Sequence, residues 1–160
     1  MRSFLAGAIV LLALSGIAHA QQQPSAKAKP KFRSNAIFVD VGGQGGLLSI
    51  NFETFIANDL AIKLGLGGFP EIFSGDDIIP IGNLMLNYIT SARTASSHLE
   101  LGFGIITTLN GEGTGPVPSA TLGYRYQEPA EGFLFHIAFT PFWTSDGLIP
   151  WAAIGLGGRF

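Results

Sequence analysis

Two histidines carry the side chains with which this sequence could catalyse a reaction. His98 stands next to Ser97 and two positions before Glu100, so a hydroxyl, an imidazole and a carboxylate lie close together in the chain. These residue types form a nucleophile, its base and the acid that orients the base, but only where the three converge in space. His98 lies at the start of a predicted strand, and His136 has no such neighbours. We therefore expect hydrogen-bonding roles for both histidines.

Other short motifs also carry little chemistry. The acids Asp76 and Asp77, together with Glu71, have the oxygen ligands that calcium prefers, but adjacent acids in a loop are more often simply solvated. The stretch GGQGG at 42–46 lacks the lysine and the following helix of a phosphate-binding loop, so it is interpreted as a turn. The sequence has no HExxH, no GxSxG and no cysteine. It predicts no catalysis, no cofactor and no metal site.

The remaining ionisable residues share a position rather than a motif. Each lies on the polar or small side of a segment whose alternate residues are bulky and apolar, as strands show with their period of two. We predict that these residues form a charge cluster inside a barrel, in which the three basic residues meet the three acids. The predicted cluster consists of Asp40, Glu53, Lys63, Glu100, Arg125, His136 and Arg159.

Eight segments show this alternation, and they must position the cluster. Glycine recurs at every second position within several of them, which would cost about 1 kcal/mol per residue in a helix relative to alanine. Their number and length fit an all-β fold, an eight-stranded antiparallel up-and-down transmembrane β-barrel. The predicted strands are 36–42, 47–56, 60–68, 79–89, 98–107, 119–127, 132–140 and 151–160.

Composition supports a barrel whose apolar side faces lipid. The chain is 47% hydrophobic and only 12% charged, whereas about 25% of the residues are charged in an average soluble domain. The interior of an eight-stranded barrel is just wide enough for side chains to fill. Charges inside it must be paired, because desolvating each one alone costs several kcal/mol. A wide aqueous channel is therefore not expected.

The N-terminal region predicts export. Residues 1–20 combine Arg2, an apolar run and the small residues Ala18 and Ala20, which is the pattern of a signal peptide cleaved after Ala20. Residues 21–34 form a flexible basic linker, and residues 35–160 the barrel domain. From Asn35 onward, four basic residues stand against eleven acidic ones, a net charge of −7, which excludes nucleic acid as a partner.

The C-terminus resembles the last strand of bacterial outer-membrane barrels. Phe160 ends an alternating row with Ile154, Gly155 and Leu156, although Gly158 replaces the usual apolar residue. The whole mature chain resembles small barrels of the OmpX and OmpA-membrane-domain type. This resemblance implies a bacterial outer-membrane location, contact with outer-membrane lipid, and recognition of the C-terminal strand by the barrel-assembly machinery. It names no surface partner.

The resemblance also leaves alternatives open. Some barrels of this size deacylate lipid A with a histidine and a serine two positions apart, but Ala138 stands at that spacing from His136. A non-catalytic structural or interaction role is therefore the main expectation. A lipid-modifying enzyme of the deacylase type and a secreted soluble ligand-binding barrel are the alternatives. With the N-terminus in the periplasm, the loops after the first, third, fifth and seventh strands would face outward.

Overall fold

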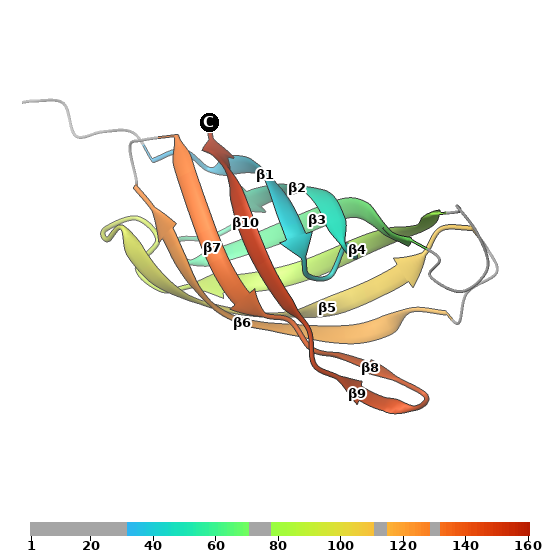
Figure 1. The fold of residues 1–160 in the computed structure, drawn as a ribbon. Helices are drawn as coiled ribbons and strands as arrows, with labels where there is room; N and C mark the ends of the chain where they lie inside the picture. Colours follow the sequence, from blue (N-terminus) through green and yellow to red (C-terminus); the bar gives the residue numbers. More distant parts are fainter. Residues whose placement is uncertain (1–31, 71–77, 111–114, 129–131) are drawn as a thin grey trace, which may run out of the picture.

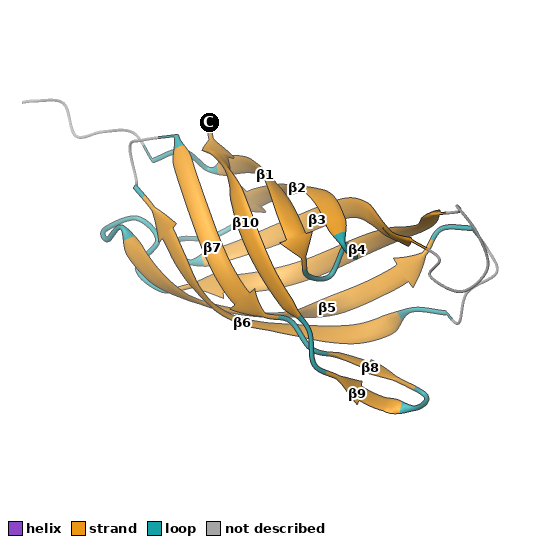
Figure 2. Cartoon of the chain, viewed as in Figure 1, coloured by secondary structure: helices purple, strands orange, loops and turns teal. Residues whose placement is uncertain are grey.

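The protein forms one closed antiparallel sheet (Figures 1 and 2). The computed structural model describes residues 32–70, 78–110, 115–128 and 132–160. The predicted signal peptide and residues 21–31 of the predicted linker lie outside them. The strands are β1 (Asn35–Gly42), β2 (Leu48–Phe55), β3 (Leu60–Pro70), β4 (Ile78–Ile89), β5 (Ser97–Thr108), β6 (Val117–Gln127), β7 (Phe133–Phe139), β8 (Phe142–Thr144), β9 (Gly147–Ile149) and β10 (Ala152–Arg159).

Strands β1 to β7 and β10 close into a barrel. Successive strands from β1 to β7 pair as antiparallel neighbours, and β10 pairs with both β7 and β1. The first and last strands therefore lie side by side, which confirms the predicted up-and-down barrel of eight long strands. The chain enters β1 and leaves β10 at one end, here called the terminal end. The opposite end is called the loop end (Figure 1).

The segment before β10 differs from the prediction. We expected residues 145–150 to be a loop, but β8 and β9 form a small hairpin that extends from the loop end (Figure 2). Thr144 pairs with Gly147, so only Ser145 and Asp146 form the turn. Gly147, the residue that follows this turn, has a φ of +122°, a backbone conformation that glycine adopts readily and other residues rarely do. Three-residue strands are too short for their alternation to be visible in the sequence.

The two faces of the wall have inverted polarity relative to a soluble protein. Outward side chains are bulky and apolar, with exposed fractions of 67% for Phe103, 65% for Leu66 and 63% for Ile50. Inward side chains of the same strands are charged or polar, and Glu53, Glu100 and other charged residues are fully buried. Water would not favour such a continuous apolar surface, whereas lipid would. Among the described residues, no helix is both long and apolar enough to cross a membrane.

Candidate functional site: the charged lumen of the barrel

Every predicted member of the charge cluster lies inside the barrel. Seven strands contribute one residue each to the set, each through an inward position of its alternating pattern, and none of the seven residues is more than 2% exposed. The set is Asp40 on β1, Glu53 on β2, Lys63 on β3, Glu100 on β5, Arg125 on β6, His136 on β7 and Arg159 on β10. Their contacts divide them into a central cluster and two separate positions.

Arg125 is the centre of the lumen. Its Nη1 and Nη2 atoms donate to Glu53 Oε2 and Oε1 at 3.0 and 2.5 Å, which is a bidentate ion pair across the barrel. Its Nε donates to Gln127 Oε1 at 2.7 Å, and Glu100 Oε2 lies 3.8 Å from Nη1. Paired, charge-assisted hydrogen bonds of this kind hold the guanidinium plane in a fixed orientation. Arg125 thereby connects β6 to β2 and β5.

His136 extends the central cluster toward β1. Its Nε2 atom lies 2.7 Å from Asp40 Oδ1, and its Nδ1 atom lies 3.5 Å from Glu100 Oε2. Asn51 Nδ2 donates to the other Asp40 oxygen at 3.1 Å. The imidazole is thus placed between two carboxylates, with no hydroxyl nucleophile among its hydrogen-bond partners. We define the central cluster as Asp40, Glu53, Glu100, Arg125 and His136.

Asn87 connects the acids of the central cluster. Its Nδ2 atom donates to Glu100 Oε1 at 3.0 Å and to Glu53 Oε2 at 3.4 Å. Asn87 lies on β4 and is fully buried. The amide adds a donor where two negative groups approach each other, so it reduces their repulsion without adding charge. Strands β2, β4 and β5 are therefore joined through the lumen as well as through the wall.

Lys63 does not meet an acid, which differs from our expectation. Its ammonium donates to Gln44 Oε1 at 3.0 Å, and the ion pairs of the described residues do not include it. Gln44 lies in the connection between β1 and β2 and is 2% exposed. Its Nε2 atom donates to Thr121 Oγ1 at 2.7 Å and to the Ala120 carbonyl at 3.1 Å. The Gln44 side chain therefore spans the lumen near the loop end.

The glycines around Gln44 explain how the loop enters the barrel. Gly42, Gly43 and Gly46 have φ angles of +78°, +86° and +101°, a conformation that other residues rarely adopt. A Cβ atom at Gly43 would come within 2.9 Å of the Ala153 side chain. Residues 43–46 form the predicted turn, whereas Gly42 is the last residue of β1. The role of the one large side chain in this turn was not predicted. The feature of the sequence that could have indicated this role is the single amide side chain of Gln44, flanked by glycines on both sides.

Arg159 also lies apart from the acids, at the terminal end. Its guanidinium carbon lies 4.4 Å from the ring centroid of Phe32, and the guanidinium carbon of Arg93 lies 4.7 Å from the same centroid. Phe55 meets Phe32 edge-on at 5.2 Å. Arg33 and Arg159 exchange hydrogen bonds with each other's backbone carbonyls. Phe32 therefore lies between arginines in the segment that precedes β1.

Glycines in the wall make room for the polar side chains. Gly155 pairs with Asp40 on one side and with His136 on the other, and a Cβ atom there would overlap both His136 Nε2 and Asp40 Oδ1. Gly65 likewise lies between Asn51 and Asn83. Large inward groups thus alternate with glycine across neighbouring strands. The inward glycines of the sequence therefore leave the space that the polar side chains on the neighbouring strands occupy.

The residues that suggested hydrolysis do not converge. Ser97 and His98 are neighbours on β5, so they point to opposite faces, and Ser97 Oγ contacts the Tyr124 hydroxyl at 3.0 Å. The His98 ring nitrogens face the carbonyl oxygens of Thr90 and Gln127 at 2.7 and 3.2 Å. Within the described residues, no group of three or more His, Cys, Asp or Glu side chains could hold a metal ion. The predicted loop acids Glu71, Asp76 and Asp77 lie outside the described residues.

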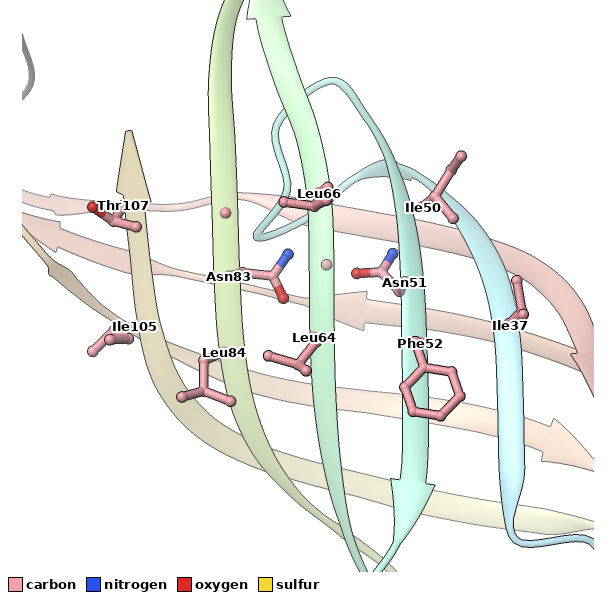
Figure 3. A pocket seen from close by; sticks show the side chains of 12 residues that line it. Ile37, Ile50, Asn51, Phe52, Leu64, Leu66, Asn83, Leu84, Ile105 and Thr107 are labelled. Carbon is pink, nitrogen blue, oxygen red and sulfur yellow. The ribbon is translucent and has the colours of Figure 1, made fainter. Parts of the chain in front are cut away.

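An apolar concavity of about 670 Å³ lies on the outer wall over β1 to β5 (Figure 3). Ile50, Leu66 and Thr107 line one side, and Gly82 falls between Leu66 and Thr107 in the same cross-strand row. The glycine leaves a gap in that row. Figure 3 shows Asn51 and Asn83 behind the strands, on the lumen side. The concavity therefore belongs to the apolar exterior, and the hydroxyl of Thr107 in its lining donates to the Thr108 carbonyl at 3.3 Å.

Comparison with solved structures agrees with this architecture. The N-terminal β-barrel domain of Pseudomonas aeruginosa OprF matches with a TM-score of 0.59 and 12% identity, over 82% of this chain and 98% of that domain. The chain has the fold of a small outer-membrane β-barrel. The Yersinia pestis outer membrane protein Ail matches with a TM-score of 0.46 and 13% identity, over 80% of this chain and 99% of Ail. No protein-family model and no curated protein matches the sequence.

Proposed function

We propose that this chain is a bacterial outer-membrane β-barrel with a structural or interaction role, without catalysis and with a closed lumen. The observation that carries the proposal is the central cluster, whose side chains fill the barrel and bond to one another. An eight-stranded barrel leaves room for side chains but not for a wide aqueous path. Arg125 occupies that room, because it reaches Glu53 on one strand and Glu100 on another. The outward apolar rows provide the surface that lipid would cover.

Both ends of the lumen support closure. At the loop end, Gln44 bonds to β3 through Lys63 and to β6 through Thr121. At the terminal end, Phe32 packs against Phe55, Arg93 and Arg159. Gln44 lies in the segment that follows β1, and Phe32 lies in the segment that precedes it. To open one end of the lumen, the short segment at that end would have to move.

The C-terminal strand supports the proposed route into the membrane. Phe160 is 56% exposed and continues the outward row of Ile154 and Leu156, which are 51% and 55% exposed. Gly155 faces inward between them. The barrel-assembly machinery is the proposed partner for this strand, and outer-membrane lipid is the proposed partner for the wall. The proposed orientation, with the N-terminus in the periplasm, places the terminal end there and the loop end outside.

Conductance across planar bilayers tests the closed lumen. Purified wild-type protein should give no stable single-channel current, whereas the triple variant Gln44→Ala, Phe32→Ala, Arg125→Ala, which also removes the guanidinium from the central cluster, should give small openings. The matched control is Leu148→Ala, which removes an exposed side chain of the β8–β9 hairpin and should stay silent. Frequent, stable wild-type channels would contradict a closed lumen. Circular dichroism of each variant establishes that it retains the barrel.

Two further measurements separate the alternatives. Mass spectra of lipid A from cells with and without the protein should be the same, and a change in acyl-chain number would favour a deacylase. The purified chain should require detergent or lipid to remain monodisperse. A chain that stays monomeric in plain buffer would favour a secreted soluble barrel. Both experiments use the complete protein and need no knowledge of a ligand.

A further inference from the structure

The inward-facing residues change character along the barrel toward the loop end. On β3 the inward row runs from Lys63 through two glycines to Phe69, and on β5 it runs from Glu100 through two glycines to Ile106. On β6 it runs from Arg125 through the polar residues Thr121 and Ser119 to Val117. The lumen is therefore charged in its centre and mostly apolar at its loop end, where Phe69, Ile106 and Val117 lie. The alternation of inward and outward residues continues unbroken along these strands. The change therefore comes from which side chains occupy the inward positions and not from a shift of register.

A cavity of about 130 Å³ occupies the apolar part. We call it the vestibule. Gln44 is its polar floor, and Thr107 and Thr108 border it, with the Thr107 hydroxyl donating to the Thr108 carbonyl. Its apolar lining side chains are Phe69, Ile81, Ile106, Val117 and Phe142. Ile81 is only 5% exposed. Trp151 packs against Phe69 with ring centroids 5.5 Å apart, so aromatic side chains support one wall. Figure 1 shows β5 and β6 continuing past the turn between β1 and β2.

The floor separates the vestibule from the charges below it. Gln44 uses its amide nitrogen on Thr121 and Ala120 and its amide oxygen on Lys63. The amide groups that could attract water into the vestibule are therefore already bonded to the protein. An apolar cavity of about 150 Å³ lined by Leu, Ile and Phe stays dry and binds benzene or xenon. The vestibule has comparable size, and Phe, Ile and Val side chains make up most of its lining beside Thr107, Thr108 and Gln44.

We propose that the vestibule is a binding site for a small apolar group, of the size of a benzene ring or the methyl end of an acyl chain. Apolar walls select hydrocarbon, because a polar ligand would lose its hydration without gaining hydrogen bonds there. The closed floor stops the ligand at Gln44. Binding at the vestibule rests on closure of the lumen at Gln44, but the two proposals fail in different measurements, conductance for the closed lumen and the methyl titration below for binding.

Methyl NMR of the full chain in nanodiscs tests the site directly, with xenon as the probe. The Ile81, Ile106 and Val117 methyl resonances should shift and saturate as xenon pressure rises. The lipid-facing methyls of Val39 and Ile154 should show only a gradual, unsaturated change. Inward methyls that follow the same unsaturated course, or that show contact with water, would overturn the proposal.

A filling variant and its control locate the binding. Val117→Phe should place a ring in the vestibule and abolish the saturable shifts at Ile81 and Ile106. The control Val39→Phe makes the same change on the outer wall and should leave these shifts intact. Saturable shifts that persist in Val117→Phe would overturn the site. If Val117→Phe does not fold, the wild-type titration still decides the proposal.

A second arm identifies the source of the apolar group. Nanodiscs are prepared with lipid that carries a spin label at the methyl end of one acyl chain. Broadening at Ile81 that Val117→Phe removes would support an acyl chain as the occupant. Saturable xenon binding without such broadening would support a free small molecule. Absence of both effects would contradict the vestibule as a binding site.

Discussion

The centre and the loop end of the lumen are built by the same strands but differ in side-chain chemistry and in how completely they are filled. In the centre, Arg125 and His136 are surrounded by carboxylates and amides, and Arg125 makes a bidentate ion pair with Glu53 while His136 contacts Asp40. At the loop end, Ile81 and Val117 leave a cavity instead of filling it. Charged groups in a narrow barrel must be bonded, so that region is full. Apolar groups have no such requirement, so they can leave space for a ligand.

The comparison also shows where each region is sensitive to change. A charge removed from the centre leaves its partner desolvated, which is expensive. A side chain changed in the apolar lining of the vestibule alters packing, and Phe32 at the terminal end contributes ring packing and cation–π contacts. Three substitutions, in order of decreasing expected effect, examine this difference.

Arg125→Ala should have the largest effect. It leaves Glu53 and Glu100 buried without their principal cation, and breaking a buried pair costs about 3–5 kcal/mol. The free energy of unfolding, measured with urea on protein refolded into vesicles, should fall by that amount. Arg93→Ala removes an exposed arginine that lies over the Phe32 ring, and should cost less than about 1 kcal/mol. Equal losses for the two variants would contradict a lumen organised around Arg125.

Gly155→Ala should have an intermediate effect. The added methyl group overlaps the contact between His136 and Asp40, and overpacking of a filled interior costs about 1–3 kcal/mol. The same vesicle unfolding experiment measures the loss. Gly115→Ala serves as the control, since nothing lies within 4 Å of a Cβ atom there. If both alanines are tolerated equally, the His136–Asp40 contact is not a tight constraint.

Phe32→Ala should have the smallest effect. It removes two cation–π contacts, each contributing roughly 0.5–1 kcal/mol, and the edge contact with Phe55. We expect a decrease of about 1–2 kcal/mol in the free energy of unfolding, together with faster amide exchange of Asn35 and Phe55. Phe103→Ala on the outer wall is the control, because it should not change exchange at the terminal end. Unchanged exchange in Phe32→Ala would show that the segment before β1 does not close the barrel.

Much of the fold was predictable because a period of two assigns each side chain to a face. The apolar rows that contain Phe103 and Leu156 point outward, as predicted, and the ionisable residues point inward. The hairpin of β8 and β9 was missed, because three residues are too few to show a period. The contacts of Gln44 were not predicted, because alternation assigns faces only to residues in strands and the Gln44 side chain enters the lumen from a loop.

The sequence by itself determined the number of long strands, the face on which each residue lies, and the position of the charges in the lumen. It could not determine which charges meet. Glu53 and Arg125 are 72 positions apart, and their contact depends on the stagger between strands and on the diameter of the closed barrel. Lys63 meets an amide and Arg159 meets aromatic rings for the same reason. Alternation is a local property of the chain, whereas distances across the lumen exist only once the barrel has closed.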